Sequence, residues 1–196
     1  MWARLEGTEI KEIIAQPKGM IIGDTQYPVN IFNLWSDAEL KGIGIYPVII
    51  DNSNLKDKDY YNNGAESFTV TTSGGTKVTK SFGTASSKSL ADTESTDPSS
   101  GNKSTVLGLK SIHKSRINSQ AASLLAEHDW MSIRAAEGGT AMPSDIKTWR
   151  ANVRTKANSM CTQIDNAADV DALAALYVYN SDDPPVRPLG EWPSKP

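Results

Sequence analysis

The chain has 196 residues, which is enough for one domain or two small ones. Only 38% of them are hydrophobic, and the 14 glycines and 10 prolines indicate many turns and extended connections around a small core. The net charge of -3 comes from mixed signs, which excludes electrostatic attraction of nucleic acid, and the single cysteine excludes an intramolecular disulfide.

The N-terminal residues 1–7 lack the apolar run of a secretory signal, and no window approaches the ~18 apolar residues of a membrane span. We therefore expect a soluble protein with no membrane partner. The lone Cys161 fits synthesis in a reducing cytoplasm. It lies in a helical apolar pattern, so we expect it to be a small core residue.

The first third of the chain is rich in strand patterns. Residues 2–14 predict a hairpin around a Gly-Thr turn, and the short apolar runs at 20–22 and 29–32 predict extended segments. Ser36 and Glu39 have the spacing of a capping box, which predicts a brief helix. Two glycines end that helix, and an apolar strand is expected over 43–50.

Residues 67–82 predict a second hairpin around a glycine pair. A two-residue turn would place Val70 opposite Thr79, whereas a three-residue loop places Val70 opposite Val78. We favour the three-residue loop because apolar cross-strand pairs set register. The ribbon is rich in threonine and weakly amphipathic, so it needs a neighbouring surface.

The next segment, 83–108, is so polar that we expect a linker that is mobile in isolation.

From residue 109 the apolar period becomes helical. A first helix is expected over 109–127, with one apolar side made of Leu109, Ile112, Ile117, Ala121 and Leu124. A second helix begins near Pro143 and carries a continuous stripe of Ile146, Trp149, Val153, Ala157, Met160 and Ile164. A third, short helix is expected over 170–176. Repeated prolines then predict an extended tail, pinned by Trp192.

These patterns predict an α+β protein with four segments. They are a strand-rich part with hairpins (1–82), a polar linker (83–108), a small helical region (109–180) and an extended proline-rich tail (181–196).

Few residues have the spacing of a catalytic or metal site. His113 and His128 are the only histidines, and we interpret both as packing residues on the first long helix. Acidic pairs such as 57/59 and 182/183 lack the other ligands of a calcium loop. We expect no catalytic residue, no cofactor and no metal.

One motif combines aromatic and charged residues at defined spacing: Asp129, Trp130, Arg134, Trp149, Arg150 and Arg154. We interpret it as a helix-turn-helix packing device in which both tryptophans are core anchors. Arg150 and Arg154 are i,i+4 neighbours that repel unless each has a partner. We therefore expect at least one arginine to bridge to Asp129 or to another chain.

This motif, with Leu124-Leu125, Pro143 and the runs 172–180 and 190–193, resembles the C-terminal block of small tail-associated proteins of tailed bacteriophages, of tail-fibre and tail-assembly type. The later runs resemble versions in phages of marine bacteria. The resemblance covers roughly residues 109–193, and the start of the chain is similar more weakly.

The resemblance implies a non-enzymatic structural subunit of the virion tail, baseplate or tail-fibre attachment, made in the host cytoplasm. Its partners would be other virion tail proteins and copies of itself in a symmetric assembly. An assembly chaperone that leaves the particle is the alternative in the same class. A phage cell-wall hydrolase and a glycan-binding adhesin module are alternatives from other classes.

Overall fold

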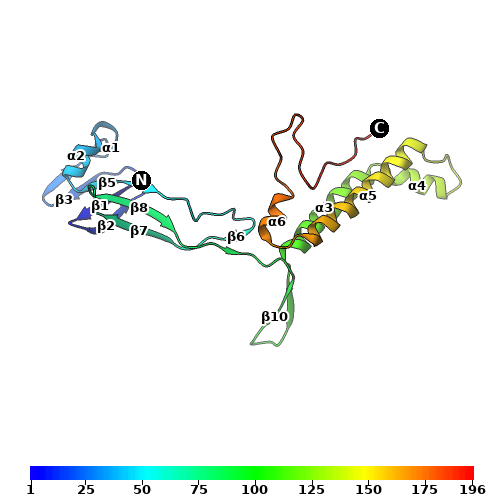
Figure 1. The fold of residues 1–196 in the computed structure, drawn as a ribbon, viewed down its shortest axis with the longest axis horizontal. Helices are drawn as coiled ribbons and strands as arrows, with labels where there is room; N and C mark the ends of the chain where they lie inside the picture. The colour runs from blue at the N-terminus through cyan, green and yellow to red at the C-terminus, as the bar shows by residue number, and fades with distance from the viewer. The chain divides into compact units, whose positions relative to one another are not determined.

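The computed structural model describes residues 1–196, which divide into two compact units, 1–86 and 87–196. Strands dominate the first unit and long helices the second, which confirms the α+β class (Figure 1). No helix combines the length and the apolar character needed to cross a membrane.

Five strands of the first unit form a mixed sheet in the order β2-β1-β5-β8-β7. Their bounds are β1 (Trp2–Glu6), β2 (Glu9–Ile14), β5 (Ile45–Ile50), β7 (Glu66–Thr71) and β8 (Lys77–Phe82). β5 and β8 run parallel, and the other neighbours are antiparallel. The β7–β8 register places Val70 opposite Val78, as the apolar pattern predicts. Val78 is fully buried.

Two short helices contribute to a small apolar cluster of the first unit, which consists of Ile14, Ile31, Phe32, Leu40 and Ile45. The capping box of Ser36 and Glu39 is present and starts α2 (Asp37–Gly42). The expected extended segment 29–32 is wrong, because α1 (Ile31–Leu34) is one helical turn. Ile31 and Phe32 are both buried, and a strand would send adjacent side chains to opposite faces. The remaining short strands are β3 (Met20–Ile22), β4 (Thr25–Tyr27), β6 (Tyr61–Asn62) and β9 (Ser86–Ser87).

The second unit begins with a regular hairpin, β10 (Thr93–Thr96) and β11 (Lys103–Val106), where composition predicts only a mobile connection. All eight strand residues are exposed, and the hairpin projects from its unit (Figure 1). Its turn is organised by Asp97, which accepts hydrogen bonds from Ser99 and Ser100. These bonds hold the pKa of Asp97 far below its usual range. The hairpin is therefore held together by backbone hydrogen bonds and by its turn, and it has no apolar core.

Helices α3 (Leu109–Ala126) and α5 (Ser144–Asn166) pack together, with α4 (Asp129–Ala136) between them in sequence and α6 (Val170–Ala175) after them. The predicted stripe of α5 is buried from Trp149 to Ile164. On α3 the stripe differs in two places, and the first is Leu124, which is only half-buried. Ile112 is 39% exposed, and His113 is buried instead, with its Nδ1 2.8 Å from the Tyr177 hydroxyl.

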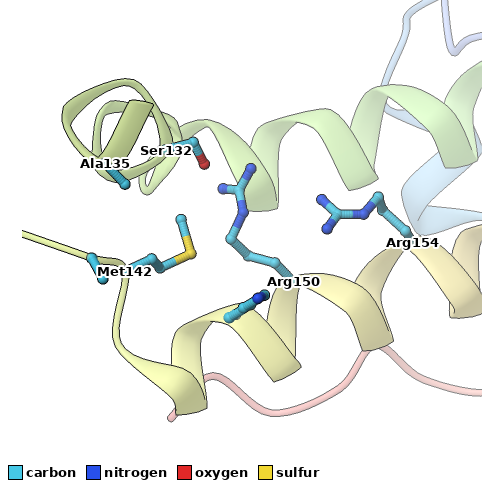
Figure 2. A pocket seen from close by; sticks show the side chains of 7 residues that line it. Ser132, Ala135, Met142, Arg150 and Arg154 are labelled. Atoms are coloured by element: carbon cyan, nitrogen blue, oxygen red, sulfur yellow. The ribbon is translucent and has the colours of Figure 1, made fainter. Parts of the chain in front are cut away.

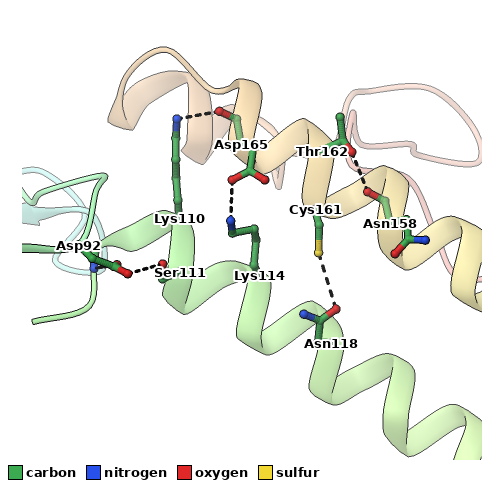
Figure 3. A network of polar contacts seen from close by, with 10 residues as sticks. Asp92, Lys110, Ser111, Lys114, Asn118, Asn158, Cys161, Thr162 and Asp165 are labelled. Atoms are coloured by element: carbon green, nitrogen blue, oxygen red, sulfur yellow. Dashed lines mark hydrogen bonds and ion pairs between the residues drawn. The ribbon is translucent and has the colours of Figure 1, made fainter. Parts of the chain in front are cut away.

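Polar contacts join the start of α3 to the end of α5 (Figure 3). Lys110 donates to the carbonyl of Asp165 at 2.8 Å, and Lys114 pairs with the Asp165 carboxylate at 2.7 Å. The Cys161 thiol points to the Asn118 side-chain oxygen at 3.8 Å. Burial raises the pKa of this thiol, but Cys161 is only half-buried, so its predicted place in the core is wrong.

The segment before the hairpin caps α3. The carbonyls of Ser89 and Leu90 accept from the first backbone N–H groups of the helix, and the Asp92 carboxylate accepts from Gly108 N–H at 2.7 Å and from the Ser111 hydroxyl at 3.0 Å. The Gly108 bond is the main reason that the pKa of Asp92 is lowered. Donors that would otherwise be unpaired at a helix start are satisfied in this way.

Acid should open this cap. A lowered folded-state pKa stabilises the fold above the ordinary pKa of about 3.9, and the stabilisation is lost as pH falls through the folded value. We expect amide-exchange protection at Gly108 to fall below about pH 4. Asp92→Asn should remove this acid response, whereas Asp24→Asn, at an exposed turn, should keep it. An unchanged acid response in Asp92→Asn would contradict the assignment.

The expected extended tail (181–196) is wrong in its first part, because bends and a turn fold residues 180–190 into a loop in which the Asn180 N–H donates to the Val186 carbonyl at 2.8 Å. Residues 191–196 lie along the helices as an extended strap. Leu189 is buried, and the Trp149 indole donates to the carbonyl of Pro193 at 3.1 Å. Trp192 donates to the Gln120 side chain at 3.3 Å, which confirms that this tryptophan pins the tail. Lys195 pairs with Glu127 at 2.6 Å.

Candidate interaction site

The predicted motif gathers where α4 meets α5, and Arg150 is its centre. One guanidinium nitrogen donates to the Leu125 carbonyl at 2.5 Å and another to the Asp129 carboxylate at 2.6 Å. Arg150 is only 7% exposed, so these two contacts fix a buried cation at the end of α3. The expectation that one arginine bridges to Asp129 is confirmed.

Trp149 is the core anchor that the sequence predicts. It is 5% exposed, and the ring of His128 meets it edge-on at 5.4 Å between centroids. His128 and His113 are both buried, which confirms that the histidines pack inside the helical unit. The Nδ1 atom of His128 is buried without a hydrogen-bond partner.

The prediction for Trp130 is wrong, because this side chain is 52% exposed. Neighbouring residues on a helix point about 100° apart, so Asp129 can face Arg150 only if Trp130 turns away from it. Helix α4 has no buried residue, and Ile133 is 60% exposed on it. The guanidinium of Arg134 lies 4.8 Å from the centre of the Trp130 ring and also donates to the Thr140 carbonyl.

A pocket of about 380 Å³ lies between α4 and the start of α5 (Figure 2). Seven residues line it, namely Ser132, Ala135, Ala141, Met142, Lys147, Arg150 and Arg154. The three cations stand at i, i+3 and i+7 of α5, so they share one side of that helix. We call this cavity the cationic pocket.

The structure brings five of the six motif residues to the α4–α5 corner in contacts or in the pocket wall, and Trp130 stays on the outer surface. Arg154 is exposed, and its side chain has no hydrogen bond or ion pair within the chain. Lys147 was not predicted. The signal was present in its helical spacing from Arg150 and Arg154.

No group of three or more His, Cys, Asp or Glu side chains is placed to hold a metal ion. A scan against protein-family models and searches of curated proteins and of solved structures found no match.

The two partners of the Arg150–Asp129 pair should differ in their effect on stability. Asp129→Ala leaves a buried cation with a single carbonyl and should cost about 2 kcal/mol of unfolding free energy. Arg150→Met removes the cation and leaves Asp129, which is 58% exposed, in water, so it should cost only about 1 kcal/mol. Urea unfolding would measure both values. In the Arg150→Met background, Asp129→Ala should add almost nothing, and a full additive loss would contradict the pairing.

Proposed function

We propose that this chain is a non-enzymatic structural subunit of a phage virion, in the tail, the baseplate or the tail-fibre attachment, and that it acts through protein-protein contacts. Other tail proteins and copies of the chain itself are the proposed partners. The resemblance over residues 109–193 is the reason for proposing that the chain belongs to a phage virion. The single observation that carries the contact role is the fully exposed β10–β11 hairpin.

The hairpin is difficult to explain in an isolated protein. A two-stranded ribbon without a covered face is marginally stable in water, and the eight strand residues bury nothing in their own chain. Its strand edges keep unpaired backbone groups that can pair with another chain. Val106 and Leu107, at the end of the ribbon, are 56% and 54% exposed. A neighbouring subunit would supply the missing face.

The test is incorporation into particles. We would shorten the hairpin by replacing residues 95–104 with Asn-Gly, which keeps the pairs Thr93–Val106 and Glu94–Thr105. The shortened chain should keep the helical circular dichroism of the original, but mass spectrometry of purified virions should find much less of it. Absence of the unmodified chain from virions would refute the structural role and favour the chaperone. Equal incorporation of both chains would refute the role of the hairpin.

A glycan-binding module is a second candidate, favoured by a hollow of about 520 Å³ beside α3. The ring of Trp192 borders it together with polar groups of Gln120 and Arg116, and aromatic faces with nearby polar groups suit sugar rings. Glycan-array binding that is lost in Gln120→Ala would support this candidate. A cell-wall hydrolase would instead show lysis of host cell walls.

A further inference from the structure

The cationic pocket has an uncompensated positive charge. Its lining contains Lys147, Arg150 and Arg154 but no carboxylate. Asp129, the one acid bonded to any of them, is already used by Arg150. Lys147 and Arg154 have no ion pair within the chain, although they lie on the same side of one helix about 10 Å apart along its axis. Each of them is also a helical neighbour of Arg150, at i,i+3 or i,i+4, where like charges repel, and a bound anion would relieve this repulsion.

One of the three cations in the pocket wall is already fixed in place. The guanidinium of Arg150 is held by Leu125 and Asp129, so it adds a fixed positive charge to the wall. Figure 2 shows the guanidinium groups of Arg150 and Arg154 on the same side of α5. Groups fixed before binding lose less side-chain freedom when a ligand arrives.

The rest of the lining identifies the class of ligand. Ala135, Ala141 and Met142 form an apolar part of the wall beside the cations. A free inorganic oxyanion gains nothing from such a surface, whereas the methylene groups and backbone of a peptide can pack on it. The combination of unpaired cations and apolar wall therefore fits carboxylates carried on a polypeptide.

We propose that the cationic pocket binds an acidic segment of a partner protein, whose carboxylates pair with Lys147 and Arg154. This inference rests on the proposed function, because it identifies what a partner subunit presents to the α4–α5 corner. Arg150 acts there as a positioning residue that fixes the charge of the wall, and Ser132 offers a hydroxyl to the same segment.

The test uses the full chain and a blocked tetraglutamate peptide as the probe, with tetraglutamine as the neutral comparison, in isothermal titration calorimetry. Lys147→Gln with Arg154→Gln should weaken tetraglutamate binding by roughly tenfold, since each exposed charge pair contributes up to about fivefold. Both residues are exposed, so the fold should survive. The matched control is Lys41→Gln with Lys77→Gln, which removes the same charge from exposed sites in the other unit and should leave binding unchanged.

Three results would overturn the proposal. They are no binding of tetraglutamate at low salt, equal weakening in both double variants, or inorganic phosphate binding as tightly as the peptide, which would assign the pocket to a free oxyanion. If the proposal holds, tetraglutamate binding must also weaken in 1 M salt, where the electrostatic screening length falls to about 3 Å. Virion composition and peptide binding are separate measurements. If the chain is present in virions but does not bind tetraglutamate, this inference alone is refuted. If the chain is absent from virions, the proposed function is refuted.

Discussion

Replacing Ile164 with alanine should lower the unfolding free energy of the helical unit by about 3 kcal/mol, which is one of the two largest losses that we expect. Ile164 is fully buried near the end of α5, where the helix packs on α3. Removal of its side chain leaves a cavity in a small core that can relax only partly. Urea unfolding followed by helical circular dichroism would measure the loss.

The matched control for this substitution is Ile133→Ala on α4. Ile133 is 60% exposed, so the same chemical change should alter stability by no more than about 0.5 kcal/mol. Because the chain has two units, the helical signal should be analysed apart from any transition of the sheet. Similar losses for the two variants would mean that the α3–α5 core is not where the structure places it.

A methyl group at Gly108 should destabilise the start of α3 by about 2–3 kcal/mol. A Cβ built there lies 2.3 Å from the carbonyl carbon of Ala91 and 2.4 Å from its oxygen. The obstacle is backbone that caps α3, so it cannot rotate away as a flexible side chain could. We expect Gly108→Ala to lower the thermal midpoint and to expose the Gly108 and Leu109 amides to exchange.

Gly42→Ala is the control for this second prediction. No atom lies within 4 Å of a Cβ at Gly42, which is the last residue of α2. The substitution should be neutral or stabilising by up to about 1 kcal/mol, because alanine restricts the unfolded chain. If Gly108→Ala proves as harmless as Gly42→Ala, the close approach of residues 90–91 to α3 is refuted.

The parts of the fold that local patterns determine could be predicted from sequence. The Ser36 capping box, the Val70–Val78 register and the apolar stripe of α5 each depend on spacing within one element or one hairpin. The β10–β11 hairpin could not be predicted, because it buries no apolar residue and its turn depends on the bonds of Asp97. Helix α1 was missed because a single four-residue turn is too short to show a helical period.

The candidate site was predictable only in part, for a geometric reason. Charge and spacing pointed to the Arg150–Asp129 pair, which the structure contains. The exposure of Trp130 depends on which way α4 turns after residue 128, and no pattern within eight residues fixes that direction. Lys147 could not be assigned to the site from sequence, because it becomes a site residue only through the pocket that α4 and the loop to α5 form around it.

The strap has a consequence for how the protein is made. Trp149 and Gln120 receive their partners from Pro193 and Trp192, which are translated 44 and 72 residues later. A ribosome therefore completes α3 and α5 well before the segment that covers them, and the indole N–H of Trp149 has only water to bond until then. The helical unit can reach its final form only after that segment has left the ribosome, so its last folding step follows translation of the strap.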